Sequence, residues 1–462
     1  MTRTPPPTPR PKPKPKPRPA KRAAVLVTVI DGDTNKRLRG ALVRIGHHHT
    51  KAKRHGIAVL HVRRTQLVVR ATLRGYATRS VRFDFRRRRK VTIRLYQPAL
   101  QWPRYGATVA RTQTQAALRV RPPFHVVWSR GLGSLIEFPA VVSDGVAFIG
   151  NFHGSVRALS MRNGHLVWRR ELHQKLAASP AVWGDRVVVH TMGAGRVYVL
   201  RRTDGKILWT YAVGSPVESS PLVLGGVDYF GSWNGRVYAL DLRRHRLRWT
   251  YRSGYKITSS VASAGWRLYV GDYGGRILAL TRGGHLAWAR SVGGRIYGTP
   301  AVADGRVFVP SSTGGSLTAF STSGRYLWRL STGSYVYSSP ATWAGRVLVG
   351  SYNGVFYCLS ARTGRALWEV GTGGSISGAA VVVNGVAYAG SFGHRIVGVA
   401  VRTGRVLVRF PHGEYVPVSG SGVRLLLHGY SRLYAVESRA LWLRRHRHPK
   451  HVEAVARHHR RR

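Results

Sequence analysis

Short apolar segments separated by glycine-rich turns fill the chain from residue 128 to residue 437. A typical unit contains an apolar strand, a turn such as Gly350-Ser351-Tyr352-Asn353-Gly354, a second strand such as 236–240, a Thr-Gly turn and a closing strand. Asn-Gly and Thr-Gly pairs supply the positive φ angles that tight hairpins need. The pattern predicts successive antiparallel hairpins and an all-β fold class.

A tryptophan recurs once in nearly every unit. Successive tryptophans are 39 to 41 residues apart, and Val408 occupies the eighth phase. The tryptophans are Trp128, Trp168, Trp209, Trp249, Trp288, Trp328 and Trp368. Four short strands at this period form a sheet too small to bury both of its faces alone, so neighbouring units must cover each other. The repeat therefore predicts an eight-bladed β-propeller over residues 101–437.

The two ends of the repeat region complement each other. Residues 416–436 supply inner strands but no closing strand with a tryptophan, whereas residues 125–128 form a closing strand without the rest of its blade. Joining them completes the eighth blade and removes exposed sheet edges that would invite aggregation. We expect the propeller to close in this way.

The best unit, Cys358 to Trp368, reads nearly as Ala-Leu-x-x-x-Thr-Gly-x-x-Leu-Trp. This run resembles the tryptophan-docking motif of the pyrroloquinoline-quinone-like (PQQ-like) propellers, which include those of the outer-membrane assembly factor B type. The resemblance implies that each of the seven tryptophans docks between adjacent blades. Two units depart from the motif: Asp204 stands where threonine is usual, and residues 239–249 lack the Thr-Gly turn.

Residues 24–97 have a different pattern. Short β-branched segments at 25–30, 41–45, 56–62, 66–72, 81–85 and 91–95 predict a small β-sandwich. The order of its short motifs, 39–45, 55–58 and 73–76, resembles the carboxypeptidase-regulatory-like or PEGA class. That resemblance implies an accessory module of the bacterial envelope, with a role in adhesion or spacing and no chemistry.

Basic residues far outnumber acidic ones: 75 Lys and Arg against 17 Asp and Glu give a formal net charge of +58. Such a charge attracts polyanions through long-range, salt-screened electrostatics. The Pro/Lys/Arg-rich residues 1–23 are expected to form a disordered linker, and residues 438–462 a basic disordered tail. Candidate contacts for nucleic acid, anionic polymers or anionic lipid headgroups are Arg86, Arg87, Arg88, Arg89, Lys90, Arg444 and Arg445. A solvated charge run without a partner explains them equally well.

Catalysis by a quinoprotein dehydrogenase would need acidic and amide ligands for calcium, a catalytic carboxylate and, in many members, an adjacent cysteine pair. The chain has one cysteine, Cys358, in an apolar strand. Several acids fall in turns, and Glu137, Glu218 and Asp272 are the least explained by the repeat. We therefore expect no enzymatic activity and neither PQQ nor calcium. The His clusters at 47–49, 446–448 and 458–459 are interpreted as solvated loop and tail, not as metal ligands.

Three hypotheses about function follow. The first is a non-catalytic binding or scaffold protein of the bacterial cell envelope with a protein partner. Trp233, Tyr273 and Tyr352 occupy a common turn that would suit a recognition face, although drift of the repeat explains the same pattern. The second is a PQQ-dependent oxidoreductase with calcium. The third is a polyanion or nucleic-acid binder that uses the basic flanks.

An extracytoplasmic location is favoured, although residues 1–4 run directly into prolines and lack the apolar stretch of a signal peptide. The longest uncharged run, 370–393, falls in phase with the repeat. It is therefore interpreted as propeller strands and not as a membrane span.

Overall fold

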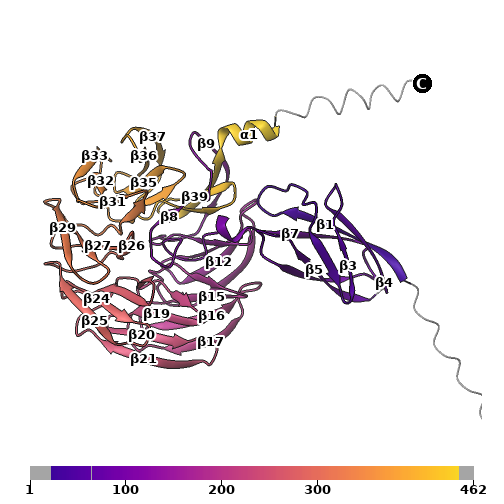
Figure 1. The fold of residues 1–462 in the computed structure, drawn as a ribbon, viewed down its shortest axis with the longest axis horizontal. Helices are drawn as coiled ribbons and strands as arrows, with labels where there is room; N and C mark the ends of the chain where they lie inside the picture. Colours follow the sequence, from indigo (N-terminus) through magenta and orange to yellow (C-terminus); the bar gives the residue numbers. More distant parts are fainter. Residues whose placement is uncertain (1–21, 64, 447–462) are drawn as a thin grey trace, which may run out of the picture. The chain divides into compact units, whose positions relative to one another are not determined.

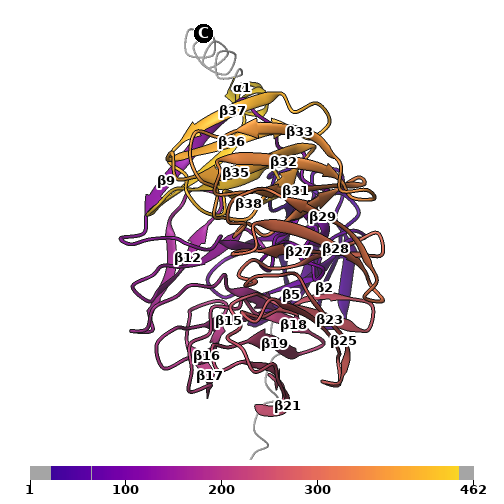
Figure 2. The same cartoon turned by 90° about the vertical axis from the view of Figure 1, so that its left-hand side faces the viewer.

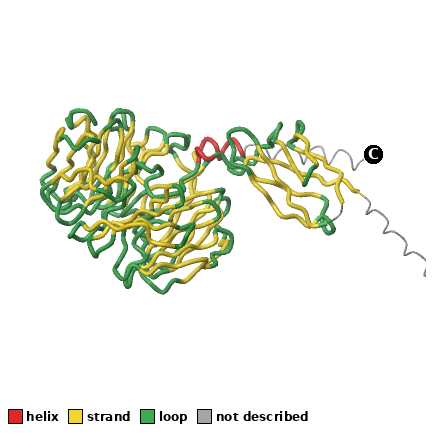
Figure 3. Tube along the Cα trace, turned by 60° about the horizontal axis from the view of Figure 1, so that its bottom comes forward, coloured by secondary structure: helices red, strands yellow, loops and turns green. Residues whose placement is uncertain are grey.

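Strands and loops make up nearly the whole of the protein in a computed structural model that describes residues 22–446 except residue 64 (Figures 1 and 3). The chain divides into two units, residues 1–96 and residues 97–462. Within the described residues, no helix has the length and apolar character that crossing a membrane requires.

The first unit consists of two β-sheets around one hydrophobic cluster. Its strands are β1 (Arg22–Asp31), β2 (Leu42–Ile45), β3 (His48–Lys51), β4 (Ile57–Arg63), β5 (Gln66–Thr72), β6 (Arg79–Asp84) and β7 (Lys90–Leu95). The sheets have the orders β4-β1-β7 and β3-β2-β5-β6. Val25, Val27 and Val29 alternate along β1 and are fully buried in the same cluster as Val43 of the other sheet. Each segment that the sequence predicts as a strand contains or overlaps an observed strand.

The histidine run in this unit was expected to lie in a loop, and this expectation is wrong. His48 and His49 belong to β3, which pairs with β2 in a hairpin whose turn contains Gly46 at a φ of +56°. Both side chains are exposed. The hairpin forms because β2 supplies the backbone partner and the glycine tolerates the left-handed turn. In the described residues, no group of three or more His, Cys, Asp or Glu side chains is arranged to hold a metal ion.

The second unit begins with the 3-10 helix η1 (Pro98–Leu100) and contains eight of the ten sheets in the described residues. Sheets 1 to 4 are β10 (Val141–Ser143), β11 (Val146–Gly150), β12 (Ser155–Ser160), β13 (Leu166–Glu171); β14 (Ala181–Trp183), β15 (Arg186–His190), β16 (Arg196–Arg201), β17 (Ile207–Ala212); β18 (Leu222–Leu224), β19 (Val227–Gly231), β20 (Arg236–Asp241), β21 (Arg246–Arg252); and β22 (Ala262–Ala264), β23 (Arg267–Gly271), β24 (Arg276–Thr281), β25 (Leu286–Ser291).

Sheets 5 to 8 continue the series. They are β26 (Ala301–Ala303), β27 (Arg306–Ser311), β28 (Ser316–Ser321), β29 (Tyr326–Ser331); β30 (Ala341–Trp343), β31 (Arg346–Gly350), β32 (Val355–Ser360), β33 (Ala366–Gly371); β34 (Val381–Val383), β35 (Val386–Ser391), β36 (Arg395–Ala400), β37 (Val406–Pro411) with β8 (Thr114–Gln115); and β38 (Val418–Ser421), β39 (Arg424–His428), β40 (Arg432–Ser438) with β9 (Phe124–Gly131). The single cysteine, Cys358, is fully buried in β32.

The sheets follow one another around a common axis, as in a β-propeller (Figure 1). Their first strands lie innermost and touch their neighbours, for example β10 with β14, β26 with β30 and β30 with β34. Figure 2 follows the same succession from a second direction, from β35 and β36 through β31 and β32 to β27 and β28. The apolar strands therefore bury both faces of each sheet, as the repeat requires.

The predicted junction between the two ends of the repeat is confirmed. Strand β9 pairs antiparallel with β40, with Trp128 opposite Ala435, and β10 contacts β38. Sheet 8 is thus built from both ends of the repeat region, and it lies next to sheet 1.

A buried histidine bridges sheets 1 and 8. The backbone N–H of Ala140 donates to Nε2 of His428 at 3.0 Å, and Nδ1 of the same ring lies 3.3 Å from the carbonyl oxygen of Pro417. This arrangement fits a neutral ring that accepts at Nε2 and donates at Nδ1. Complete burial lowers the pKa of His428 from 6.5 to about 4.

Acid should therefore weaken this contact selectively. The unfolded chain takes up the proton near pH 6.5 and the folded chain only near pH 4, so stability falls as the pH drops through that window. The difference corresponds to about 3 kcal/mol. We expect the urea midpoint of the wild type to fall more between pH 7 and pH 4 than that of His428→Gln, which does not titrate there. Parallel pH profiles for the two proteins would contradict the assignment.

A segment without repeat character, residues 102–115, crosses the axis and is called the plug segment here. Its backbone carbonyls accept hydrogen bonds from innermost-strand N–H groups of six different sheets. The acceptor and donor pairs are Trp102 and Val142, Pro103 and Val182, Val109 and Ser263, Ala110 and Val302, Thr112 and Thr342, and Gln113 and Val382.

At the centre of the plug segment, the fully buried Arg111 donates to carbonyl oxygens of Tyr105, Ser220, Pro221 and Val261 at 2.6–3.1 Å. The plug segment therefore closes one end of the space around the axis.

The basic tail was expected to lack regular structure from residue 438, but residues Arg439–His446 form helix α1. Trp442 on this helix stacks on His125 of β9, with ring centroids 4.0 Å apart. None of the residues of helix α1 is buried, and so short a helix is not stable by itself. The stacking of Trp442 on His125 therefore helps to stabilise it. The rest of the predicted tail and residues 1–21 of the predicted linker 1–23 lie outside the described residues, whereas Arg22 and Ala23 belong to strand β1.

Candidate interaction site at the centre of the propeller

Six of the seven repeat tryptophans make the same contact with the following sheet. The indole N–H donates to a backbone carbonyl oxygen in the turn between the third and fourth strands of that sheet, at 2.8–3.1 Å. The donor and acceptor pairs are Trp128 and Met161, Trp168 and Arg202, Trp249 and Arg282, Trp288 and Thr322, Trp328 and Ala361, and Trp368 and Val401.

A glycine beneath each of these rings explains the Thr-Gly turn of the repeat. At Gly364, which has a φ of +74°, a Cβ atom would lie 2.6 Å from the ring of Trp328. Trp209 differs because its neighbour has no glycine at this point: His245 stacks on the indole instead, with centroids 4.8 Å apart. The tryptophans are therefore occupied in contacts between sheets and do not face a ligand.

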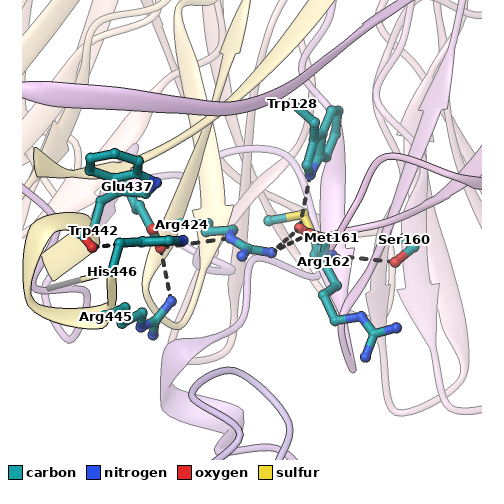
Figure 4. A network of polar contacts seen from close by, with 9 residues as sticks. All are labelled: Trp128, Ser160, Met161, Arg162, Arg424, Glu437, Trp442, Arg445 and His446. Carbon is teal, nitrogen blue, oxygen red and sulfur yellow. Dashed lines mark hydrogen bonds and ion pairs between the residues drawn. The ribbon is translucent and has the colours of Figure 1, made fainter. Parts of the chain in front are cut away.

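The contact of Trp128 belongs to a polar network at the junction of sheets 8 and 1 (Figure 4). The carbonyl oxygen of Met161 accepts from the Trp128 indole at 3.0 Å and from Arg424 at 2.7 Å. On the other side of Arg424, the Glu437 carboxylate lies 3.9 Å from its Nε and accepts a hydrogen bond from Arg445 at 3.0 Å. Arg445, a candidate polyanion contact, is thus engaged within the protein.

The remaining basic candidates have varied surroundings. Arg86 and Arg87 pair with Asp84, whereas Arg88, Arg89 and Lys90 are exposed beside them. Arg444 donates weakly to the carbonyl oxygen of Ala440 at 3.4 Å. Contact of these residues with a polyanion stays a prediction.

Two of the three unexplained acids meet in a small pocket at the axis. Glu137 and Glu218, from the turns that precede sheets 1 and 3, line it together with Thr258, Tyr297 and Tyr337 from equivalent turns. The cavity volume is about 40 Å³, which is room for about three water molecules. Its lining also includes Tyr105 of the plug segment, so the pocket is closed on that side.

The third unexplained acid, Asp272, lies elsewhere and has a structural role. It is fully buried, accepts from the Ser253 hydroxyl at 2.6 Å and from the backbone N–H of Arg276 at 3.0 Å, and pairs with the Arg276 guanidinium.

The electrostatics of the pocket are unusual for a protein of such positive charge. Burial, with the neighbouring Glu218 charge, raises the pKa of Glu137 from 4.5 to about 7, even though the Tyr297 hydroxyl donates to its Oε1 at 3.1 Å. Burial also raises the pKa of Glu218. Its Oε2 is buried without a hydrogen-bond partner, and so is Oγ1 of Thr258. A charged carboxylate that is buried without hydrogen bonds or a counter-charge is energetically unfavourable, because nothing replaces its lost hydration.

A chain of hydroxyls holds the pocket walls in place. Each backbone N–H donates to the hydroxyl of the equivalent residue one repeat later, at 2.8–3.1 Å. The series runs through Ser179, Ser220, Ser260, Thr299 and Ser339. Tyr105 of the plug segment donates to the last of them at 3.1 Å. The walls are therefore fixed before any ligand arrives, which reduces the entropy cost of binding.

An arc of aromatic side chains surrounds the pocket on the side of these turns. Neighbouring rings have centroids 5.0–6.0 Å apart and mostly meet edge to face. The aromatic arc consists of Tyr297, Tyr335, Tyr337, Tyr352, Phe392 and Tyr415. Tyr335 is 50% exposed, so part of the arc is available to a partner.

Beside the arc, the ammonium group of Lys256 lies 3.1 Å from the ring centroid of Trp233 and 4.9 Å from that of Tyr273. Trp233, Tyr273 and Tyr352 were singled out from their common turn, and the structure places all three around the axis on this face. The pocket residues Tyr297 and Tyr337 were missed. A usable signal existed, since Glu137, Glu218, Thr258, Tyr297 and Tyr337 occupy one phase of the repeat.

These residues do not suit PQQ, a planar three-ring molecule with three carboxylates. Its negative charges would meet Glu137 and Glu218, and the cavity of about 40 Å³ is far smaller than three fused rings. Calcium would need more carboxylate and amide oxygens than the two glutamates provide. No catalytic step through that cofactor follows from this geometry.

The ring of sheets with docked tryptophans defines a β-propeller of the PQQ-like repeat class. The family model described as outer membrane protein assembly factor BamB matches residues 153–256, 233–342 and 314–440, which together exceed half of the chain. The chain therefore belongs to this family.

Two curated relatives bear the same name, outer membrane protein assembly factor BamB. The protein of Burkholderia pseudomallei is 32% identical over 103 residues, which cover 22% of this chain and 26% of the relative. That of Xanthomonas campestris pv. campestris is 30% identical over 111 residues, covering 21% and 27%. The matched region thus spans about a quarter of each relative's length.

Solved structures share the fold. BamB from Moraxella catarrhalis has a TM-score of 0.59 and 19% identity, and the match covers 69% of this chain and 98% of that one. The quinohemoprotein alcohol dehydrogenase from Comamonas testosteroni has a TM-score of 0.64 and 14% identity, with coverage of 73% and 80%. At such identities the likeness concerns the fold alone, which serves proteins of different function.

Proposed function

We propose that this protein is a non-catalytic binding or scaffold protein of the bacterial cell envelope. Its eight sheets act as the eight blades of a closed ring, and the face with the central pocket and the aromatic arc receives a protein partner. The aromatic arc carries the proposal, because exposed, clustered tyrosine and phenylalanine side chains are typical of the energetic centres of interfaces. Membership of a family described as assembly factors supports it.

The first unit serves as an accessory module in this proposal. Its two sheets around one cluster suit the carboxypeptidase-regulatory-like or PEGA class that its motifs resemble. A second, weaker contact with anionic polymers is proposed for the exposed Arg88, Arg89 and Lys90.

The quinoprotein alternative has support in the fold of the dehydrogenases and none in the pocket. A catalytic carboxylate would have to act on a substrate next to the quinone, but the cavity that Glu137 and Glu218 line has a volume of only about 40 Å³. We therefore propose the binding function over the oxidoreductase function.

The test compares two pairs of aromatic side chains, one in the aromatic arc and one outside it. Tyr335→Ala with Tyr352→Ala truncates the aromatic arc, and Trp266→Ala with Tyr326→Ala truncates side chains 81% and 58% exposed away from it. The full chain, immobilised, is exposed to native envelope extract, and captured proteins are cross-linked and quantified by mass spectrometry. We expect the arc variant to lose at least about tenfold of the specific capture, since hot-spot aromatics each contribute about 2 kcal/mol. The control variant should capture as the wild type does. Equal capture by both variants would refute the proposed face.

A further inference from the structure

The central pocket contains two buried acceptors that have no well-formed hydrogen bond within the protein. Glu218 is 9% exposed and Thr258 is 5% exposed; Oε2 of the first and Oγ1 of the second line the cavity without hydrogen-bond partners. Two neighbouring donors interact with these side chains, the indole N–H of Trp233 with Glu218 and the hydroxyl of Tyr273 with Thr258. The indole nitrogen, Glu218 Oε2 and Thr258 Oγ1 nevertheless all lie outside well-formed hydrogen bonds. Unsatisfied buried acceptors in a native pocket call for a donor from outside.

The required donor carries positive charge. Glu137 and Glu218 are two carboxylates in one cavity, and no cation contributes to the environment of Glu137. The walls around them are aromatic: Tyr105, Tyr297 and Tyr337. Carboxylates combined with ring faces form the environment that desolvated organic cations prefer.

The volume of the cavity and the number of its acceptors indicate which kind of cation fits. A primary ammonium group has three N–H donors, which equals the three acceptors Glu137, Glu218 and Thr258. It is compact, whereas a guanidinium is a planar fork with five donors. The cavity of about 40 Å³ suits the small group at the end of an alkyl chain.

Within the protein, Lys256 already places one amino group on this face, where burial lowers its pKa and the charge of Glu218 opposes that shift. Its Nζ lies over the ring of Trp233 and near Tyr273. Lys256 also interacts with the charge of Glu218, but it does not line the cavity. The position within the pocket therefore remains open to a second ammonium group.

We propose that the central pocket binds a protonated primary amine on an unbranched alkyl chain, presented by a lysine side chain of the partner. The inference rests on the proposed function: the aromatic arc receives the protein partner, and the pocket binds one lysine side chain of that partner. In a chain with a formal net charge of +58, this carboxylate pocket attracts cations where most of the surface repels them.

Binding should depend on pH through Glu137. Its pKa of about 7 reflects burial, the charge of Glu218 and the Tyr297 hydrogen bond; the other titratable or charged groups around the two carboxylates are Tyr273, Tyr415, Lys256 and Arg295. A bound cation favours the ionised carboxylate and so releases a proton near neutrality, while the amine stays charged. Affinity should therefore be about tenfold lower at pH 6 than at pH 8.

The experiment titrates n-butylammonium into the full chain by calorimetry at pH 6 and pH 8, in two buffers of different ionisation enthalpy. We expect saturable binding, proton release at pH 7, and at least about tenfold weaker binding by Glu218→Gln, in which one charge is lost. Glu414→Gln is the matched control: Glu414 occupies the turn before sheet 8, pairs with His394 and does not line the pocket. It should bind as the wild type does.

Further ligands test whether a lysine side chain can supply the amine, and whether the pocket prefers an ammonium to a guanidinium group. The tripeptide Gly-Lys-Gly should compete with butylammonium, whereas its Nε-acetylated form and n-pentanol should not bind. Butylguanidinium should bind more weakly. Three results would each overturn the inference: binding of the uncharged ligands, an affinity of Glu218→Gln for butylammonium equal to that of the wild type, or failure of the peptide to compete. Thermal unfolding verifies that Glu218→Gln is folded, and Glu137→Gln at pH 8 provides an independent variant.

The outcome separates this inference from the proposed function. Loss of partner capture in the arc variant without amine binding by the wild type refutes the ammonium site and leaves the interaction face intact. Equal capture by the arc and control variants, together with amine binding by the wild type, refutes the proposed interaction face. The pocket would then be a site for free amines and not for a lysine side chain of a partner.

Discussion

Replacing Trp328 by alanine is expected to lower the free energy of unfolding by about 3–5 kcal/mol, as for other buried tryptophans. The side chain is 7% exposed, donates its indole N–H to the Ala361 carbonyl at 3.1 Å, and lies 5.9 Å from the Phe308 ring, measured between centroids. Its removal leaves a cavity at the boundary between sheets 5 and 6 and an unpaired carbonyl oxygen. Chemical denaturation followed by intrinsic fluorescence measures the loss.

Two further variants make this prediction specific to the docking contact. Trp266→Ala removes an indole that is 81% exposed and should change stability by less than about 1 kcal/mol. Gly364→Ala tests the same contact from the opposite side, because the new Cβ would lie 2.6 Å from the Trp328 ring at a φ of +74°. Similar losses for Trp328→Ala and Trp266→Ala would show that the docking contact does not hold the sheets together.

Replacing Arg111 by alanine should destabilise the second unit by a comparable amount, about 3–5 kcal/mol. The guanidinium is fully buried, and three of its four hydrogen bonds hold the plug segment to carbonyl oxygens next to sheets 3 and 4, while the fourth goes to Tyr105 within the segment. Burial lowers the pKa of Arg111 to about 9, which reflects how little charge compensation it receives. Truncation leaves these carbonyl oxygens unpaired in a site from which water is excluded.

Limited proteolysis reports on this change locally. The plug segment of the wild type should resist cleavage, because its backbone carbonyls are bonded to innermost strands of six sheets. In Arg111→Ala we expect cleavage within residues 102–115 and loss of the floor of the central pocket. Arg119→Ala, an exposed arginine shortly after the plug segment, is the control and should keep the wild-type pattern. Resistance of both variants would refute the role of Arg111.

The junction between β9 and β40 could be predicted from the sequence, because a repeat with a fixed period shows which strand is missing at each end. The exception at Trp209 could not be resolved in the same way. The motif showed only that Thr-Gly is absent from the next unit, whereas the structure shows that His245 adopts a φ of +55° and stacks on the indole. A local turn can be predicted from its residues, but the contact that replaces it depends on another strand.

The acids illustrate the same division. Asp144 and Asp304 are among the acids whose position before a glycine predicts a turn, and both adopt the positive φ of turn residues. Glu137 and Glu218 are two repeats apart in sequence, and only closure of the ring brings them into one pocket. Their pKa values follow from that burial, which no composition can reveal.

The sequence by itself determined the all-β class, the period of the repeat, the docking tryptophans and the junction of its two ends, because short-range turn chemistry and periodic apolar strands encode them. Only the tertiary structure decided that residues 102–115 cross the axis, that His428 bridges the first and last sheets, and that two carboxylates, a threonine and an arc of tyrosines surround one cavity. These features depend on contacts between residues far apart in the chain. Such contacts exist only after the sheets have packed around a common axis.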